Sequence, residues 1–281
     1  MHKILAIVGP TGTGKTARAI AEAKKTPSII VSADSRQVYR GMDIVTGKDH
    51  PRGTILYGID LVDPDKPCSV AVWHDAIMSR VLDAWEEGKQ VIVVGGTGLY
   101  VRALTDGIET MAVPPNDSLR KFLSTLSLTK LQSKLKEKNP KKFQSMNESD
   151  KQNARRLIRA IEITDSGISM VQNPNALEVA IIGLKYGNVT KYQEAIQERV
   201  VDRLKEGAVE ETKTLLSKYD RNLPSMSAIG YKSVINFIEG SYTKEEMIKQ
   251  WVNDELRYAK RQMTWFAKVP QIKWYDSKRE E

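Results

Sequence analysis

Residues 9–16 read Gly9-Pro10-Thr11-Gly12-Thr13-Gly14-Lys15-Thr16 and match the phosphate-loop pattern Gly-x-x-x-x-Gly-Lys-Ser/Thr at every defined position. The apolar run Ile4–Val8 before the loop is typical of a buried parallel strand, and residues 17–23 after it are rich in helix formers. Such a loop turns free N–H groups and the positive end of a helix dipole toward an anion. We therefore predict that it binds phosphates, with Lys15 on the terminal phosphates and the Thr16 hydroxyl on a magnesium ion.

The composition is that of a globular protein. The chain has 281 residues, of which 41% are hydrophobic and 28% are charged, enough for one domain with an insertion or for two domains. It contains no apolar run as long as a membrane span, no secretory signal pattern and a single cysteine, Cys68, which cannot form an internal disulfide. We therefore expect a cytoplasmic monomer that does not associate with membranes.

Most of the net charge of +8 lies in one block. Residues 117–166 contain 12 basic and 6 acidic residues, whereas residues 1–116 contain 13 of each. A local basic surface predicts a polyanionic partner, nucleic acid first. The alternative is a lysine-rich helical face that is simply solvated.

Apolar strands and helical patterns alternate in the first half of the chain, as in a parallel α/β sheet. Strands are expected at 29–31, 55–59 and 91–94, and another at 179–184. Between them, residues 117–166 show helical patterns alone, at 117–126, 129–138 and 150–165. Further helices are expected at 189–206, 208–219, 227–238 and 243–267. We predict an α/β fold: a P-loop NTPase-like parallel sheet core, residues 1–109 and 176–281, with a helical insertion at residues 110–175.

Two polar residues follow predicted strands near the phosphate loop. Asp34 comes after strand 29–31, at the edge where ligands gather in parallel sheets, and could bind magnesium or act as a general base. Strand 91–94 ends in Gly95-Gly96-Thr97, without the aspartate that many nucleotide hydrolases place there. The Thr97 hydroxyl could donate to a phosphate oxygen, although a plain tight turn explains the sequence equally well. With no Asn-Lys-x-Asp run in the chain, these features disfavour motors and switch GTPases.

Arginines on later helices are candidates for phosphate contacts. Arg155 and Arg159 share one face at i, i+4, with Arg156 beside them, which suits a nucleic-acid backbone or a solvated surface. Arg199 lies on a later helix and could reach the core site. Residues 257–266 mix basic and aromatic side chains, which suits stacked bases or docking of the aromatic rings on the core.

In this order, the motifs resemble those of the tRNA dimethylallyltransferase family over essentially the whole chain. The run from Ser32 to Ile44, which contains Asp34, is the most specific to the family. The matching runs are residues 9–16, 32–44, 95–100, 155–162, 228–232, 260–262 and 264–266. The sequence departs from the family pattern at two places: Leu56-Tyr57-Gly58-Ile59-Asp60 lacks a histidine pair that is common there, and Thr46-Gly47-Lys48 replaces Thr-Ala-Lys.

The resemblance implies transfer of the dimethylallyl group of dimethylallyl diphosphate to N6 of the adenosine just 3′ of the tRNA anticodon, with Mg²⁺ as cofactor and the anticodon stem-loop as partner. It also implies a tunnel in which the adenine meets the diphosphate. Asp34 would be the general base, and Thr97, Lys15 and Arg199 would complete the catalytic set. The implied diphosphate-binding residues are Gly9, Pro10, Thr11, Gly12, Thr13, Gly14, Lys15 and Thr16, the last also binding the metal. The implied tRNA-binding residues are Asp34, Ser35, Arg36, Gln37, Thr97, Arg120, Arg155, Arg156, Leu157, Ile158, Arg159, Ser227, Ala228, Ile229, Gly230, Tyr231 and Lys232.

Three other functions remain compatible with the residues. A small-molecule kinase would use the same loop on ATP, with Asp34 as base for a substrate hydroxyl, but would have no need of the basic block. A non-catalytic RNA-binding module would have no need of an intact Lys15, Thr16 and Asp34. A prenyltransferase acting on free adenine nucleotides would have no use for the insertion.

Overall fold

The computed structural model describes residues 2–51, 53–168 and 178–277 and divides into two compact units. The core unit comprises Met1–Asp106 and Asn175–Glu281, and the helical unit comprises Gly107–Pro174. The boundaries lie within three residues of those expected from the sequence. Strands are confined to the core unit among the described residues, and the predicted α/β class is confirmed.

The core unit contains a six-stranded sheet in the order β3-β2-β4-β1-β5-β6, and every pair of neighbouring strands is parallel. The central strand β1 pairs on one side with β4, Val8 opposite Gly95, and on the other with β5, Val8 opposite Gly183. The carboxyl ends of the strands therefore meet at one edge, where the phosphate loop also lies. The strands are β1 Lys3–Val8, β2 Ser28–Ser32, β3 Leu56–Tyr57, β4 Gln90–Gly95, β5 Glu178–Lys185 and β6 Lys273–Asp276.

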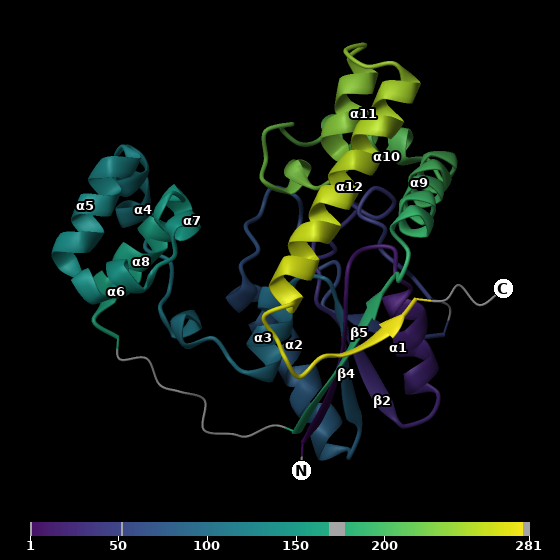
Figure 1. Cartoon of the computed structure of the whole chain (residues 1–281), viewed down its shortest axis with the longest axis horizontal. Helices are drawn as coiled ribbons and strands as arrows, with labels where there is room; N and C mark the ends of the chain where they lie inside the picture. The colour runs from purple at the N-terminus through teal and green to yellow at the C-terminus, as the bar shows by residue number, and fades with distance from the viewer. Residues whose placement is uncertain (1, 52, 169–177, 278–281) are drawn as a thin grey trace. The chain divides into compact units, whose positions relative to one another are not determined.

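Two edge strands differ from the sequence prediction. Strand β3 covers two residues instead of 55–59, because Ile55 is exposed and Gly58 turns the chain with φ of +85°. Strand β6 was not predicted; it pairs with β5 and lies beside it in Figure 1, in yellow. Its residues are half-buried or exposed, so it lacks the apolar pattern of a buried strand.

Buried apolar residues join the strands to the helices of the core unit. Leu5, Ile7, Ile92 and Val94 pack together with Ala19 of α1. Helices α9 to α12 lie beyond the carboxyl ends of the strands (Figure 1). The helices are α1 Lys15–Ala23, α2 Val70–Glu86, α3 Gly98–Thr105, α9 Val189–Lys205, α10 Ala208–Leu216, α11 Tyr231–Ile238 and α12 Lys244–Phe266, with the 3-10 turn η2 Ser225–Ser227. No described helix is long and apolar enough to cross a membrane.

The helical unit is built around its own apolar cluster, in which Leu123, Leu131, Leu135 and Leu157 are fully buried. The side chain of an Asn or Ser residue caps the N-terminus of each helix from α4 to α8. One such cap, Asn153, divides the helix expected at 150–165 into α7 and α8. The elements are η1 Glu109–Ala112, α4 Asp117–Ser124, α5 Leu128–Lys138, α6 Pro140–Ser145, α7 Glu148–Lys151 and α8 Ala154–Ser166.

Candidate active site

The phosphate loop has the backbone of an anion cradle. Helix α1 begins at Lys15 directly after Gly14, which has φ of +72°, so the first N–H groups of the helix have no partner within it. Gly9 has φ of +142°, and a Cβ at this position would lie 2.2 Å from the carbonyl oxygen of Leu184 on β5. Glycine is therefore required at Gly9 by both conformation and space.

Lys15 lies in an environment that penalises its charge. Its ammonium donates to the carbonyl oxygen of Pro10 at 2.6 Å. Burial, and then the nearby charge of Arg199, lower its pKa to about 8, and the carboxylates of Asp34 and Asp49 offset only part of this effect. A phosphate group bound beside Lys15 would favour its charged form.

A cavity of about 660 Å³ brings together three of the four predicted catalytic residues, Lys15, Asp34 and Arg199, and Thr97 is not among the residues that line it. Lys15, Thr16, Asp34 and Arg199 all line it, although they come from three separate parts of the sequence. A second cavity of about 870 Å³ shares the loop glycines Gly12 and Gly14 as well as Arg199 with the first. Both cavities lie in the core unit, so the loop is accessible from two sides.

Asp34 and Thr97 lie next to each other at the edge of the sheet. One carboxylate oxygen of Asp34 accepts the backbone N–H of Arg36 at 2.8 Å. The Thr97 hydroxyl oxygen accepts the backbone N–H of Ser35 at 3.1 Å. This hydrogen bond holds the Thr97 side chain beside Ser35, the residue after Asp34, and the Thr97 hydroxyl lies 3.5 Å from the Ser35 hydroxyl, to which it donates.

Arg36 and Gln37, two of the residues predicted to bind tRNA, already have protein partners. The side-chain amide of Gln37 accepts the Ser32 hydroxyl at 2.9 Å and donates to the Gly47 carbonyl at 3.2 Å. Arg36 donates to the carbonyl oxygen of Pro224 at 3.0 Å. These bonds hold the two side chains at the cavity wall.

Helix α12 also contributes residues to the cavity: Glu255 was not predicted, whereas Tyr258 and Gln262 lie within the predicted basic and aromatic run 257–266. Glu255, Tyr258 and Gln262 lie on one face at i, i+3 and i+7, and all three line the first cavity. Glu255 is buried and accepts a hydrogen bond from Arg203 of α9 at 2.8 Å. Burial raises the pKa of Tyr258, and its hydroxyl hydrogen-bonds Thr97. The signal was present in the sequence: Glu255 and Gln262 are polar residues within the buried stripe of an amphipathic helix.

A further residue that was not predicted, Glu211, holds the loop that carries Gly47. The carboxylate of Glu211 on α10 accepts three consecutive backbone N–H groups, those of residues 43, 44 and 45, at 2.8, 2.6 and 3.0 Å. It also accepts the Tyr231 hydroxyl at 2.8 Å. One carboxylate therefore anchors the loop to α10 and α11.

Comparison with known proteins identifies the family. A family model described as IPP transferase matches residues 37–269, and a second, described as isopentenyl transferase, matches residues 2–59. The tRNA dimethylallyltransferase of Halalkalibacterium halodurans is 34% identical, over 98% of this chain and 91% of the relative. That of Acetivibrio thermocellus is 36% identical over the same shares.

The chain belongs to the tRNA dimethylallyltransferase family.

Solved structures agree with this assignment. The tRNA isopentenylpyrophosphate transferase from Bacillus halodurans superposes with a TM-score of 0.73 at 33% identity, covering 99% of this chain and 90% of that one. A eukaryotic dimethylallyltransferase acting on tRNA has the same fold, with a TM-score of 0.82 at 22% identity, over 99% of this chain and 75% of that one. The family resemblance inferred from the sequence is confirmed.

Several residues that the resemblance assigned to tRNA are buried. Tyr231 is fully buried, Ala228 is 2% exposed, and Gly230 packs so closely that a Cβ would lie 2.6 Å from the Trp251 ring. Tyr231 donates to Glu211 and Gly230 packs on Trp251, so the tRNA contacts expected of these residues stay a prediction. Ser227 and Lys232 are exposed and Ile229 is half-buried.

Part of α8 in the helical unit is also buried. Leu157 is fully buried in the apolar cluster, so its side chain cannot contact RNA in this structure, and Ile158 is half-buried beside it. Arg156 forms an ion pair with Asp150. Arg155 is exposed and makes no ion pair with any residue that the structure describes.

Two of the predicted tRNA-binding arginines are bound to a buried carboxylate. Arg120 donates two hydrogen bonds to Glu162, at 2.8 and 2.7 Å, and Arg159 pairs with the same group. Although burial alone would raise it, the pKa of Glu162 is lowered to about 2 by hydrogen bonds from Arg120, the Asn116 backbone and Arg159. Arg159 also donates to the carbonyl oxygens of Thr110 and of residue 113, at 2.6 and 2.9 Å. These contacts hold α8 to α4 and to the chain before it.

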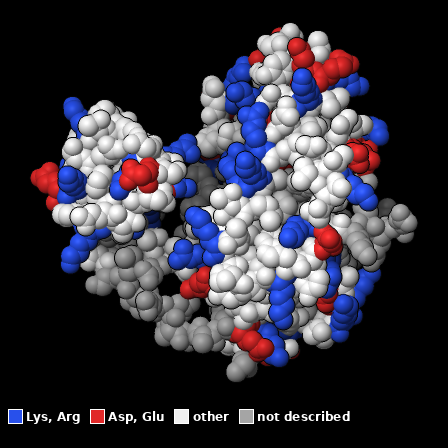
Figure 2. Space-filling model, viewed as in Figure 1, with Lys and Arg blue, Asp and Glu red and all other residues white. Residues whose placement is uncertain are grey.

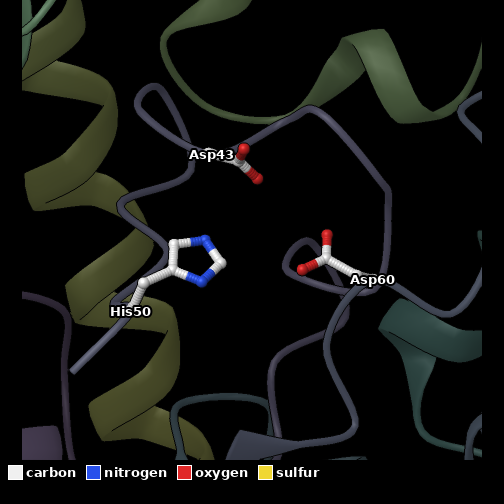
Figure 3. A group of neighbouring side chains, drawn as sticks. All are labelled: Asp43, His50 and Asp60. Atoms are coloured by element: carbon white, nitrogen blue, oxygen red, sulfur yellow. The ribbon is translucent and has the colours of Figure 1, made fainter. Parts of the chain in front are cut away.

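Three potential metal ligands of the core unit lie close together. Figure 3 shows Asp43, His50 and Asp60 around a common centre, with ligand atoms within 4.8 Å of one another. The ammonium of Lys48, whose side chain has no exposed surface, lies 2.5 Å from Asp43 and 2.5 Å from Asp60 and donates to the Tyr39 carbonyl at 2.8 Å. Because the buried Lys48 pairs with both carboxylates, we interpret the group as an ion-pair centre that fixes the loop.

Proposed function

We propose that this chain transfers the dimethylallyl group of dimethylallyl diphosphate to N6 of the adenosine just 3′ of a tRNA anticodon and releases diphosphate. The observation that carries the proposal is the single cavity in which the cationic cradle of Lys15 and Arg199 meets the Asp34 carboxylate. The names of the family's relatives state prenyl transfer to tRNA. In this proposal the adenine and the diphosphate meet in the first cavity, with the diphosphate against Lys15 and Thr16 and the adenine beside Asp34.

The cradle stabilises the leaving group. When the C–O bond breaks, negative charge develops on the departing diphosphate. Lys15, Arg199 and the N–H groups at the start of α1 are already oriented toward that charge, which is how preorganised sites lower a barrier. The Thr16 hydroxyl lines the same cavity, and hydroxyl oxygens are suited to Mg²⁺. The ion, when bound there, would neutralise part of the diphosphate charge.

Asp34 takes the proton that the reaction releases. As the N6 nitrogen forms its bond to carbon, one N–H must lose its proton. One oxygen of Asp34 is held by the Arg36 N–H, which orients the other oxygen toward the amine as a general base. Thr97, fixed by Ser35, directs its hydroxyl proton to the diphosphate oxygen that gains charge.

Exposed basic side chains of the two units bind the tRNA backbone. In the core unit, Lys and Arg recur over α12 on the face shown in Figure 2. Arg257, Lys260 and Arg261 of this helix are exposed. In the helical unit, Arg155 and the lysines of α5 and α6 serve the same purpose. The target adenine leaves its stack to reach Asp34, as chemistry on a base requires.

A direct assay tests this function. Purified protein is incubated with Mg²⁺, labelled dimethylallyl diphosphate and one of three acceptors: unmodified tRNA, the same tRNA with guanosine at the target position, or AMP. Label should enter the first acceptor alone. Label in AMP would indicate a nucleotide prenyltransferase, and tRNA-independent phosphorylation of a small molecule from ATP would indicate a kinase. No transfer to any acceptor, from protein shown to be folded, would refute the proposal.

A further inference from the structure

The side chain of Gln262 connects two loops of the active site. Its amide oxygen accepts the backbone N–H of Thr11 in the phosphate loop at 3.0 Å. Its amide nitrogen donates to the carbonyl oxygen of Gly96, in the turn after β4, also at 3.0 Å. A single planar group thus spans the phosphate loop and the turn that carries Thr97.

The surroundings leave little freedom to this amide. Gln262 is 5% exposed, and a Cβ on Gly96 would lie 1.9 Å from its nitrogen, so a glycine is needed for the approach. A buried amide without hydrogen-bond partners costs free energy, so the loss of either bond would destabilise the folded protein. The two bonds together keep the amide in this position. Glutamine suits the position because its neutral side chain offers a donor and an acceptor at fixed separation. A glutamate would face the Gly96 carbonyl with a second acceptor.

The two connected loops follow neighbouring strands. Val8 of β1 is opposite Gly95 of β4, so the sheet sets where each loop begins but not how far apart the loops stay beyond it. Gly96 is the residue before Thr97, and Thr11 lies within the diphosphate cradle. The separation between cradle and Thr97 hydroxyl therefore depends on the bridging amide.

We propose that Gln262 is a positioning residue of the transfer reaction. It sets the distance between the diphosphate cradle and Thr97, and through the Ser35 N–H it also sets the distance to Asp34. The inference rests on the proposed function, since it concerns the geometry of that reaction. Gln262 acts through Thr11 and Gly96 and touches neither the prenyl group nor the adenine.

Replacing the amide should affect turnover more than binding. In Gln262→Met the length of the side chain is kept and both hydrogen bonds are lost. Because misplacement by about 1 Å can cost about 10²-fold, kcat should fall by about 10- to 100-fold. The KM for dimethylallyl diphosphate and the Kd for tRNA should each change by less than about threefold, because the groups that bind them stay in place.

A matched control lies on the same helix. Gln250 bonds to Asp254 within α12 at 3.2 Å and reaches neither loop. Gln250→Met should leave kcat within about twofold of the unaltered protein. A loss confined to tRNA affinity in Gln262→Met would show that Gln262 contacts RNA instead, and would overturn the inference.

A double-mutant cycle tests whether Gln262 acts through Thr97. In a Thr97→Val background, Gln262→Met should lower kcat by less than about threefold further, since the group to be positioned is already absent. If the two substitutions instead lowered kcat independently, so that the double variant showed the product of the two single effects, the inference would be overturned. If Gln262→Met does not fold, Gln262→Glu keeps the shape and the bond to Thr11, and a normal kcat in that variant would equally overturn it. Absence of transfer by the unaltered protein would instead refute the proposed function.

Discussion

The lowered pKa of Lys15 predicts that diphosphate binding weakens as pH rises through a range in which an ordinary lysine is unaffected. Burial and Arg199 bring this pKa to about 8, from an ordinary value of 10.5. An anion placed beside the ammonium favours its charged form and therefore raises the pKa. Binding above pH 8 must then be accompanied by uptake of a proton.

The magnitude follows from the fraction of Lys15 that is charged. With a pKa of about 8, that fraction is about 0.9 at pH 7 and about 0.1 at pH 9. If the charged form is the one that binds, the Kd for dimethylallyl diphosphate should rise about tenfold between these pH values. A lysine with the ordinary pKa would change its charge over this range by only a few per cent.

Calorimetry measures both the affinity and the proton uptake. The protein is titrated with dimethylallyl diphosphate and Mg²⁺ in the absence of tRNA, at pH 7, 8 and 9, in two buffers that differ in ionisation enthalpy. The terminal phosphate is already ionised at pH 7 and above, so changes in Kd report on the protein. The difference in heat between the buffers should correspond to about 0.1 proton at pH 7 and about 0.9 at pH 9.

Lys15→Arg is the matched variant, because a guanidinium stays charged throughout this range. Its Kd should be weaker overall but should not depend on pH. A flat Kd and no proton uptake in the unaltered protein would refute the electrostatic reasoning about the cradle.

Other substitutions test single contacts. Asp34→Asn should lower kcat by about 10²- to 10⁴-fold with little change in tRNA affinity, as measured by single-turnover transfer and filter binding. Arg155→Ala should reduce the slope of log affinity for tRNA against log salt by about one unit, and an unchanged slope would place the contact elsewhere. Glu211→Leu leaves three backbone N–H groups and one hydroxyl without their acceptor and should lower the free energy of unfolding by about 2–4 kcal/mol in urea titrations. The pKa of Glu162 in the folded protein is about 2, below its ordinary value of 4.5. The ionised Glu162 therefore contributes fully to stability above pH 4.5, and this contribution is lost as the pH falls toward 2. In thermal melting experiments, Glu162→Gln should not show this loss of stability at acid pH.

The local motifs of the core could be predicted because each is contiguous in sequence. The phosphate loop, the strand before it and the helix after it require no knowledge of distant residues. Strands β1 and β4 are buried over most of their length, and β1, β4 and β5 all carry the apolar runs typical of parallel sheets. Strand β6 could not be found in this way, because an edge strand is stabilised mainly by its backbone pairing with β5.

Long-range partners of polar residues could not be predicted from spacing. The arginines of α8 have the spacing of a phosphate-binding face, yet Arg159 is bound to Glu162. Glu162 stands three residues further along the helix, so this pair was visible in the sequence, whereas its second partner, Arg120, comes from α4. Leu157 of the same helix is fully buried in the apolar cluster, an environment that the arginine spacing did not reveal.

The strand order has a consequence for how the protein folds during synthesis. The central strand β1 begins at Lys3, but one of its two neighbours, β5, begins at Glu178. The helical unit lies between them in sequence, and its contacts are local. It should therefore form while β1 is paired with β4 at most and still lacks its second neighbour, β5. The amide of Gln262 arrives later still. A chain leaving the ribosome from its N-terminus would therefore expose an incomplete sheet edge for most of translation, and the phosphate loop, encoded first, would be among the last parts to reach its final shape.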